Sequence, residues 1–186
     1  MGASIKERGL LTMFGLTSPK RPSDPWPLKF RHYDFGVRCY NTLRCSVVYN
    51  NYCFTRLYVD TPSGASPSED WRDSWSAGHD GGVEFGPPVA AEWVSLDGVE
   101  HHALIDIGEL FNDRLVRHRV PREHIPEGWL AAWGIDPLSV DIVMEVNDRT
   151  IIVYMRAHIT TKLPQIPDNP RSCHRRDLIP VWSNTY

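Results

Sequence analysis

Short runs of β-branched and aromatic residues, separated by turn-forming residues, begin at Asp34 and continue to about residue 159. The first two turns contain Asn41-Thr42 and Asn50-Asn51. Runs bounded in this way are typical of strands, and their spacing of about nine or ten residues favours a β-meander. The first three predicted strands span residues 35–40, 45–49 and 54–59.

Two later segments carry the signal of a β-hairpin. Asp97-Gly98 separates residues 89–94 from residues 101–107, and Asn147-Asp148 separates residues 140–146 from residues 149–159. Asp-Gly and Asn-Asp are suited to tight turns that need a positive φ. We therefore expect an antiparallel pair of strands on either side of each turn.

Helical signals are few and short. Residues 108–116 suit a short helix, and residues 121–133 contain another, with Pro126 near its first turn and Gly134 as its stop. Together these patterns predict a mainly β protein: an antiparallel β-sandwich or curled meander with one or two short helices.

The two ends of the chain differ from its middle. Residues 1–33 are basic and rich in proline, which disfavours helices and central strands, so we expect an extended arm with Trp26 packed on the body. Residues 164–186 are rich in Pro, Arg and polar residues and are predicted to be irregular. The β-rich part then spans residues 34–163. A chain of 186 residues is most simply one domain overall.

The most informative segment is the long stretch of residues 60–88, which we call the aromatic loop. It has no sustained periodicity and many Gly, Pro and Ser residues, yet it contains Trp71, Trp75 and Phe85. Loops of this length are usually functional or disordered, and disordered segments are poor in aromatic residues. The sequence therefore predicts a contact surface.

Trp71 and Trp75 are four residues apart, so one helical turn would bring both rings to one side. Two interpretations remain open: the indoles anchor the loop to the sheet, or they contact a partner, because tryptophan is enriched in binding hot spots. In the second case, replacing either by alanine should weaken binding by at least about 2 kcal/mol. The candidate partner-binding residues are Trp71, Arg72, Asp73, Trp75, His79, Asp80, Glu84 and Phe85.

Charge is distributed unevenly. The whole chain carries −3, but residues 34–155 hold nineteen acidic and nine basic residues, and both ends are basic. This pattern fits either an ordinary solvated acidic domain or an acidic face offered to a basic partner. Nucleic-acid binding through the basic ends is a further alternative, although a sequence pI near 6.2 is not typical of dedicated binders.

Candidate chemistry is sparse. No nucleophile elbow, phosphate loop or zinc motif occurs, so no cofactor is expected and we predict that the protein is not an enzyme. The alternative is a metal-dependent hydrolase that uses His79, Asp80 and one of His101 or His102. Adjacent residues of a strand point to opposite faces, so His101 and His102 cannot both line one site.

Four cysteines do not make a disulfide-dense scaffold, and Cys39 and Cys45 are predicted to be buried core thiols. No apolar run reaches the length of about 20 residues that spans a bilayer. We expect no integral membrane segment and a soluble cytoplasmic protein, or a periplasmic one if a native signal peptide has been removed.

Residues 34–107 resemble a group of bacterial proteins, the immunity proteins of type VI secretion phospholipase toxins. The resemblance lies in Tyr40-Asn41-Thr42, Tyr49-Asn50, Gly81-Gly82 and Pro87-Pro88-Val89-Ala-Ala-Glu-Trp93. Members of that group carry a cysteine pair where this chain has Phe85-Gly86. The resemblance implies a non-enzymatic inhibitor that covers the active site of a cognate toxin or effector.

Overall fold

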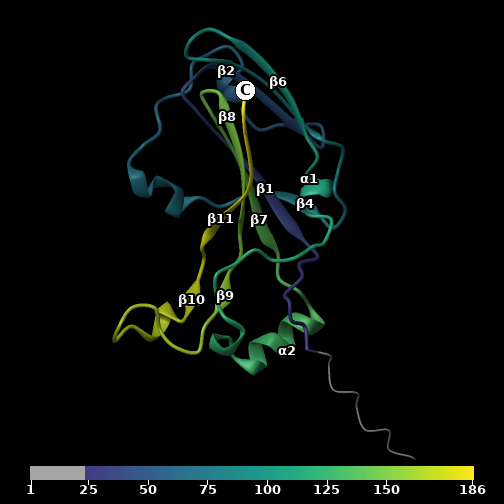
Figure 1. Ribbon diagram of the computed structural model, residues 1–186, viewed down its shortest axis with the longest axis vertical. Helices are drawn as coiled ribbons and strands as arrows, with labels where there is room; N and C mark the ends of the chain where they lie inside the picture. Colours follow the sequence, from purple (N-terminus) through teal and green to yellow (C-terminus); the bar gives the residue numbers. More distant parts are fainter. Residues whose placement is uncertain (1–23) are drawn as a thin grey trace, which may run out of the picture.

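The computed structural model describes residues 24–186, with only the backbone described for Glu69 and Asp70. Strands make up 40% of the structure and helices 16%, with two short α-helices, which confirms the predicted mainly β class. Two sheets lie face to face in the upper part of the molecule, and α2 lies at the opposite end (Figure 1). The predictions for residues 1–23 lie outside the described residues.

One sheet has five strands in the order β11-β8-β7-β1-β4. Neighbours are antiparallel except for β1 and β7, which run parallel over eight residue pairs. The strands are β1 (Tyr33–Tyr40), β4 (His79–Gly82), β7 (Val140–Asn147), β8 (Thr150–Arg156) and β11 (Leu178–Thr185).

The other large sheet has four antiparallel strands in the order β3-β2-β5-β6, and a two-stranded pair, β9 with β10, lies apart from it. These strands are β2 (Thr42–Tyr49), β3 (Tyr52–Cys53), β5 (Val89–Ser95), β6 (Glu100–Ile105), β9 (Ile159–Thr160) and β10 (His174–Arg175). The helices are α1 (Ile107–Leu110), α2 (Glu127–Ile135) and four 3-10 turns, η1 (Arg56–Tyr58), η2 (Glu69–Ser74), η3 (Arg122–His124) and η4 (Pro170–Ser172).

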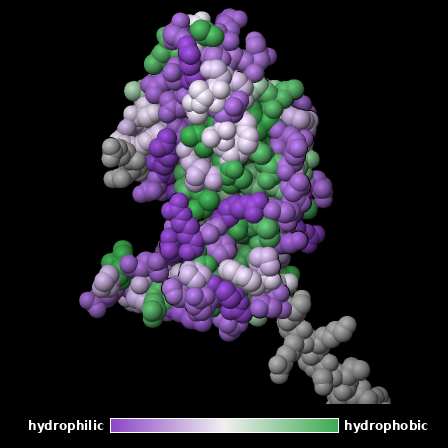
Figure 2. All heavy atoms as spheres, in the orientation of Figure 1, coloured by the Kyte–Doolittle hydropathy of each residue, from purple (hydrophilic) through white to green (hydrophobic). Residues whose placement is uncertain are grey.

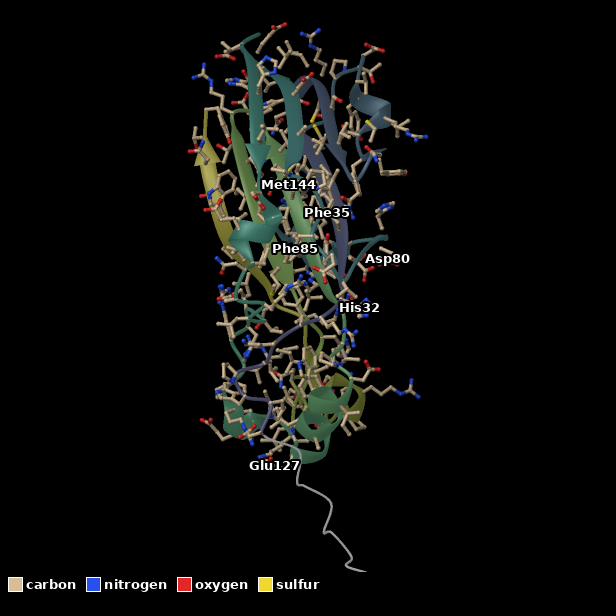
Figure 3. All side chains as sticks on the ribbon, turned by 90° about the vertical axis from the view of Figure 1, so that its right-hand side faces the viewer. His32, Phe35, Asp80, Phe85, Glu127 and Met144 are labelled. Atoms are coloured by element: carbon tan, nitrogen blue, oxygen red, sulfur yellow. The ribbon has the colours of Figure 1, made fainter. Side chains whose placement is uncertain are left out.

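The core lies between the two large sheets. Alternate residues of each strand point inward, so large side chains from both sheets meet there. Phe35 and Met144 lie close together in this layer (Figure 3). The Tyr33 and Tyr49 hydroxyls are hydrogen-bonded at 2.7 Å, and burial raises the pKa of Tyr33 well above its ordinary value. The buried hydroxyls are therefore paired with each other rather than left without a partner.

Both predicted hairpins are confirmed. β5 pairs with β6 across a turn in which Gly98 has φ +83°, and β7 pairs with β8 across a turn in which Asp148 has φ +51°. Gly and Asp are tolerated at these positive φ values, and this explains why the two dipeptides were such direct signals.

The predicted meander is wrong in its pairing. Asn41 has φ +53° and turns the chain so that β1 and β2 enter different sheets. The predicted strand over residues 54–59 is also wrong. Thr55 Oγ1 accepts a hydrogen bond from the Val47 amide at 2.8 Å, and the chain then turns into η1, so β3 stops after two residues.

The predicted irregular C-terminal segment is partly wrong as well. β11 pairs with β8 along its whole length and forms one edge of the five-stranded sheet. Its register shifts between Pro180 and Trp182. Proline is tolerated in an edge strand because the missing N–H has no required partner there, so the proline-rich composition concealed a real strand.

The helical predictions hold in part. α1 is a single turn, shorter than predicted, and Asp106 caps it by accepting a hydrogen bond from the Glu109 amide at 2.9 Å. α2 follows Pro126 as predicted but ends at Ile135, one residue beyond the expected glycine stop. Trp26 contacts the His118 ring edge-on at 5.4 Å between ring centroids, so the described end of the arm is packed on the body.

Cys39 and Cys45 are buried in the core, as predicted, and the four cysteines are free thiols. Within the described residues, no helix is both long and apolar enough to cross a bilayer.

Two histidines should make the fold sensitive to acid. Burial lowers the pKa of His118, and burial lowers the pKa of His158, with a further contribution from His174, whose ring stacks on it at 4.6 Å. The unfolded chain therefore binds protons more readily than the folded chain. Stability should be full above the ordinary histidine pKa of about 6.5 and should fall as the pH drops through that value toward the lowered pKa values.

We expect urea unfolding to give a smaller free energy of unfolding at about pH 5 than at about pH 7. In a His118→Gln, His158→Gln double variant, this difference should shrink. An equally large difference in the variant would assign the acid sensitivity to other groups.

Candidate partner-binding surface

The aromatic loop has more regular structure than the sequence indicated. Residues 69–74 form η2, and residues 79–82 form β4, which pairs with the start of β1. The loop thus begins after η1, crosses the outer face of the five-stranded sheet and becomes its edge strand β4 before it reaches β5 of the other sheet. The expectation that this segment has no regular structure is therefore corrected.

The outer face of the five-stranded sheet carries polar and aromatic side chains. Met144 and Val146 of β7 point into the core, so the intervening Glu145 points outward, and Tyr154 and Arg156 of β8 lie on the same outer side. All three are nevertheless buried, because the aromatic loop lies over them.

Glu145 is the centre of this contact. Its side chain is 0% exposed, and its carboxylate accepts two hydrogen bonds from the Arg72 guanidinium, both at 3.1 Å. The Tyr154 hydroxyl donates a third at 3.0 Å, and the Asn147 amide donates a fourth at 2.9 Å. Pairing with Glu145 raises the pKa of Arg72, and burial next to this carboxylate raises the pKa of Tyr154 to about 12. The buried charge is fully hydrogen-bonded, as a stable buried carboxylate requires.

Arg156 holds the loop from the other side. The residue is 4% exposed, and its guanidinium donates to the carbonyl of Trp75 and, at 3.1 Å each, to the carbonyls of Arg72 and Asp73. These carbonyls lie at the C-terminal end of η2, where the Arg72 carbonyl also accepts from the Trp75 amide, and an arginine is well suited to cap such an end. Burial lowers the pKa of Arg156, with a smaller contribution from Arg176. We refer to Arg72, Glu145, Tyr154 and Arg156 as the polar clamp.

An aromatic cluster reinforces the polar clamp. The Trp71 and Trp75 rings meet edge-to-face at 4.6 Å, which confirms that a helical turn brings them together. Tyr40 of β1 contacts Trp71 edge-on at 4.4 Å, and the Arg72 guanidinium lies 4.5 Å from the centre of the Trp71 ring. Trp75 is only 4% exposed and packs on Val143 and Tyr154, whereas Trp71 is half-buried. Trp75 is therefore an anchor, and Trp71 is accessible on one side.

Several candidate residues of the loop remain open to solvent. Asp73, Asp80 and Glu84 are exposed, as are the small residues Ser74 and Ser76 between them. Asp80 projects from the margin of the molecule (Figure 3), and its carboxylate accepts a hydrogen bond from the Gly82 amide at 2.8 Å. The described exposed charges of the loop, Asp60 among them, are thus acidic. The polar clamp holds the backbone that carries Asp73, and pairing with β1 holds that of Asp80.

His79 lies between these acids. Its ring stacks on Tyr52 at 4.6 Å and contacts Phe54 edge-on at 5.2 Å. A shallow hollow of about 210 Å³ opens beside it, lined on its other side by Gly36 and Arg38 of β1. Arg38 donates a hydrogen bond to the carbonyl of Ser76 at 3.0 Å. The hollow joins the edge of β1 to the loop and adds a concave feature to the exposed surface.

Phe85 packs on the core as well as belonging to the loop. Its ring packs on Tyr33 at 4.9 Å, and the Arg114 guanidinium lies 3.9 Å from its centre. In Figure 3 it lies over the body of the molecule, away from Asp80. Phe85 therefore anchors the returning end of the loop to the core, and its half-buried ring keeps part of its surface accessible.

The residues of the hydrolase alternative are not gathered at one place. His79 and Asp80 belong to β4 in the five-stranded sheet, whereas His101 and His102 belong to β6 in the other sheet. His101 points inward, stacks on Trp93 at 5.0 Å and contacts Ser95 Oγ at 2.9 Å, whereas His102 is exposed. Among the described residues, no three His, Cys, Asp or Glu side chains are grouped as metal ligands would be.

The basic residues at the two ends of the chain are described only in part. Lys20 and Arg21 lie outside the described residues, and Arg175 is paired with Asp177 at 2.7 Å. The nucleic-acid alternative therefore gains no structural support from the residues that the structure places.

Sequence reasoning missed three residues of the polar clamp. Glu145, Tyr154 and Arg156 were taken as ordinary positions of a hairpin. The available signal was that Glu145 and Arg156 stand inside two apolar β-runs, since a buried charge in such a run is usually paired.

Comparisons with known proteins give no relatives. No family model, no curated protein and no solved structure matches the chain.

Proposed function

We propose that this chain is a non-enzymatic protein-binding factor whose partner contacts the exposed side of the aromatic loop. The observation that carries the proposal is the polar clamp, which holds a long surface loop in one conformation by a buried, fully paired carboxylate and a buried arginine. A surface that is already ordered loses less conformational entropy on binding, so more of the contact energy contributes to affinity.

The exposed side chains of this loop indicate the kind of partner. Asp60, Asp73, Asp80 and Glu84 are exposed acids of the loop, and Trp71 presents a half-buried indole. Such a surface suits a basic partner with an apolar or aromatic contact residue. Within this class we favour an immunity protein that covers a cognate toxin or effector, as the family resemblance of residues 34–107 implies.

A growth experiment tests this function. Candidate toxins are the products of genes next to the one that encodes this chain, produced one at a time in a bacterial host. We expect the wild-type protein to restore growth against one of them, and an Asp73→Asn, Asp80→Asn, Glu84→Gln variant to protect less well. A matched variant with equal charge loss outside the aromatic loop, Glu92→Gln, Glu100→Gln, Glu109→Gln, should protect normally. If no neighbouring product is toxic, or if both variants protect equally, the proposal is wrong.

Trp71 should contribute directly to binding. We expect Trp71→Ala to weaken partner affinity by at least about 2 kcal/mol, because an accessible indole next to charged groups has the character of a hot spot. Isothermal titration measures the effect, with Trp26→Ala as the control for loss of an exposed indole. Equal affinity of wild type and Trp71→Ala would place Trp71 outside the interface.

The acidic side chains should act mainly on the association rate. Exposed acids attract a basic partner electrostatically. Salt screens this attraction beyond about 8 Å at physiological ionic strength. We expect the association rate to fall steeply between about 50 and 500 mM salt while the dissociation rate changes far less. The triple variant Asp73→Asn, Asp80→Asn, Glu84→Gln should lose most of this salt dependence in stopped-flow measurements. A level association rate in wild type would show that the acids are only solvated.

A further inference from the structure

The edges of the two sheets are not equally protected. β11 has an irregular register around Pro180, β4 is four residues long and ends in Gly82 with φ +81°, and β3 is two residues long. Short strands, bulges and proline prevent the addition of a further strand. β6 is the exception: its six residues, Glu-His-His-Ala-Leu-Ile, pair regularly with β5 and include no Pro, Gly, Lys or Arg.

The hydrogen bonds of the β5–β6 hairpin show which backbone groups of β6 are open. The Ser95 amide donates to the Val99 carbonyl at 3.0 Å, so Ser95 and Val99 form a hydrogen-bonded pair. In an antiparallel ladder such pairs alternate along the strand, and the register places Trp93 opposite His101 and Ala91 opposite Ala103. His101, Ala103 and Ile105 therefore direct their N–H and C=O groups toward β5. Glu100, His102 and Leu104 direct theirs away from the sheet.

These outward groups have no partner among the described residues. β6 pairs only with β5, and no other described backbone or side chain bonds the N–H or C=O of Glu100, His102 or Leu104. Leu104 is also 76% exposed, whereas the other exposed large hydrophobic residues of the strands, Leu43, Val48 and Tyr52, are 38–41% exposed. Hydrophobic residues gather along the side of the molecule on which β6 runs (Figure 2). The strand combines open backbone groups with an unusually exposed apolar side chain.

We propose that β6 pairs with β6 of a second copy of this chain, antiparallel and about a two-fold axis at His102. In this register His102 lies opposite His102 of the second copy, and Glu100 lies opposite its Leu104. All three outward residues of each copy then form hydrogen-bonded pairs, so the three N–H and three C=O groups of each strand are satisfied. The two four-stranded sheets join into one continuous sheet.

A second copy suits this edge for two reasons. A two-fold axis makes the edge complementary to itself, since the donors of one copy meet the acceptors of the other. The strand has one carboxylate, and the His102 register places it opposite a leucine rather than another acid, with no like charges directly opposed. A register centred on Ala103 leaves Glu100 facing Asp106 and is disfavoured.

Sedimentation velocity over about 1–500 µM tests the proposal, because small edge-to-edge interfaces are usually weak. We expect a concentration-dependent shift from monomer to dimer in the wild type. His102→Glu should abolish it, since two carboxylates would then lie opposite each other at the axis. The control His124→Glu changes an exposed histidine elsewhere and should dimerise normally. A wild type that stays monomeric throughout, or a His102→Glu variant that dimerises like wild type, overturns the proposal.

Disulfide trapping tests the register independently. In a background with Cys53→Ser and Cys173→Ser, His102→Cys should cross-link under mild oxidation by a glutathione redox buffer, because opposed residues of a hydrogen-bonded pair have Cα atoms about 5.5 Å apart. Two Glu100→Cys thiols would be about 13 Å apart along the strands and should not cross-link. Equal cross-linking of both variants, or of neither, contradicts the His102 axis.

Discussion

Glu145→Ala should lower the free energy of unfolding by about 3–5 kcal/mol, because removing one partner of a buried ion pair leaves the other polar groups uncompensated. The carboxylate is fully buried and accepts four hydrogen bonds, from Arg72, Tyr154 and Asn147. Arg72 is partly exposed and can turn to water, but the Tyr154 hydroxyl is buried and loses its acceptor. Urea unfolding monitored by tryptophan fluorescence gives the value.

A second ion pair provides the control for this prediction. Glu100 pairs with Arg44 on the outer face of the four-stranded sheet, where both side chains are more than half exposed. Glu100→Ala should change stability by about 1 kcal/mol or less, since exposed pairs contribute little. If Glu145→Ala costs no more than Glu100→Ala, the polar clamp does not stabilise the fold.

Trp75→Ala should have a comparably large effect, about 3–5 kcal/mol, because the lost indole leaves a cavity between the loop and the sheet. Trp75 packs on Val143 and Tyr154, and its carbonyl accepts from Arg156. The sequence left open whether the indoles anchor the loop or contact a partner, and it did not distinguish Trp71 from Trp75. The structure separates them, so Trp75→Ala should reduce stability first and binding only as a consequence.

Trp71→Ala is the matched comparison. Loss of the half-buried Trp71 ring should lower the free energy of unfolding by about 1–2 kcal/mol, within the ordinary range for a partly buried site. Thermal unfolding of the two variants, measured by circular dichroism, gives the contrast. Equal losses for both would show that the two indoles have the same structural role, and Trp71 would no longer be favoured as a contact residue.

The sequence predicted those parts of the fold that depend on local patterns. The two hairpins were predictable because Asp97-Gly98 and Asn147-Asp148 fix the turn and alternation fixes the strands. The pairing of β1 with β7 was not predictable in the same way. It joins residues about a hundred positions apart, and no turn signal marks a parallel, non-local contact.

For the candidate surface too, local features were predictable and non-local contacts were not. Its aromatic and acidic residues were identified from composition, and the proximity of Trp71 and Trp75 from their spacing. What holds the loop was missed, because Glu145 and Arg156 lie some seventy to eighty residues from Arg72 and Trp75 along the chain. The packing of Phe85 was missed for a related reason: its contacts with Tyr33 and Arg114 are set by the tertiary fold.

Hydrogen exchange of the loop amides tests most directly whether the aromatic loop is a fixed surface. The Trp71 amide donates to the Ser68 carbonyl and the Trp75 amide to the Arg72 carbonyl, both at 3.1 Å. In the wild type these two amides should exchange far more slowly than in an unstructured peptide, and in Glu145→Ala they should lose that protection while the amides of β7 keep theirs. Wild-type amides that exchange at the unstructured rate would contradict the account, because a mobile loop could not be the preorganised surface that binds the partner.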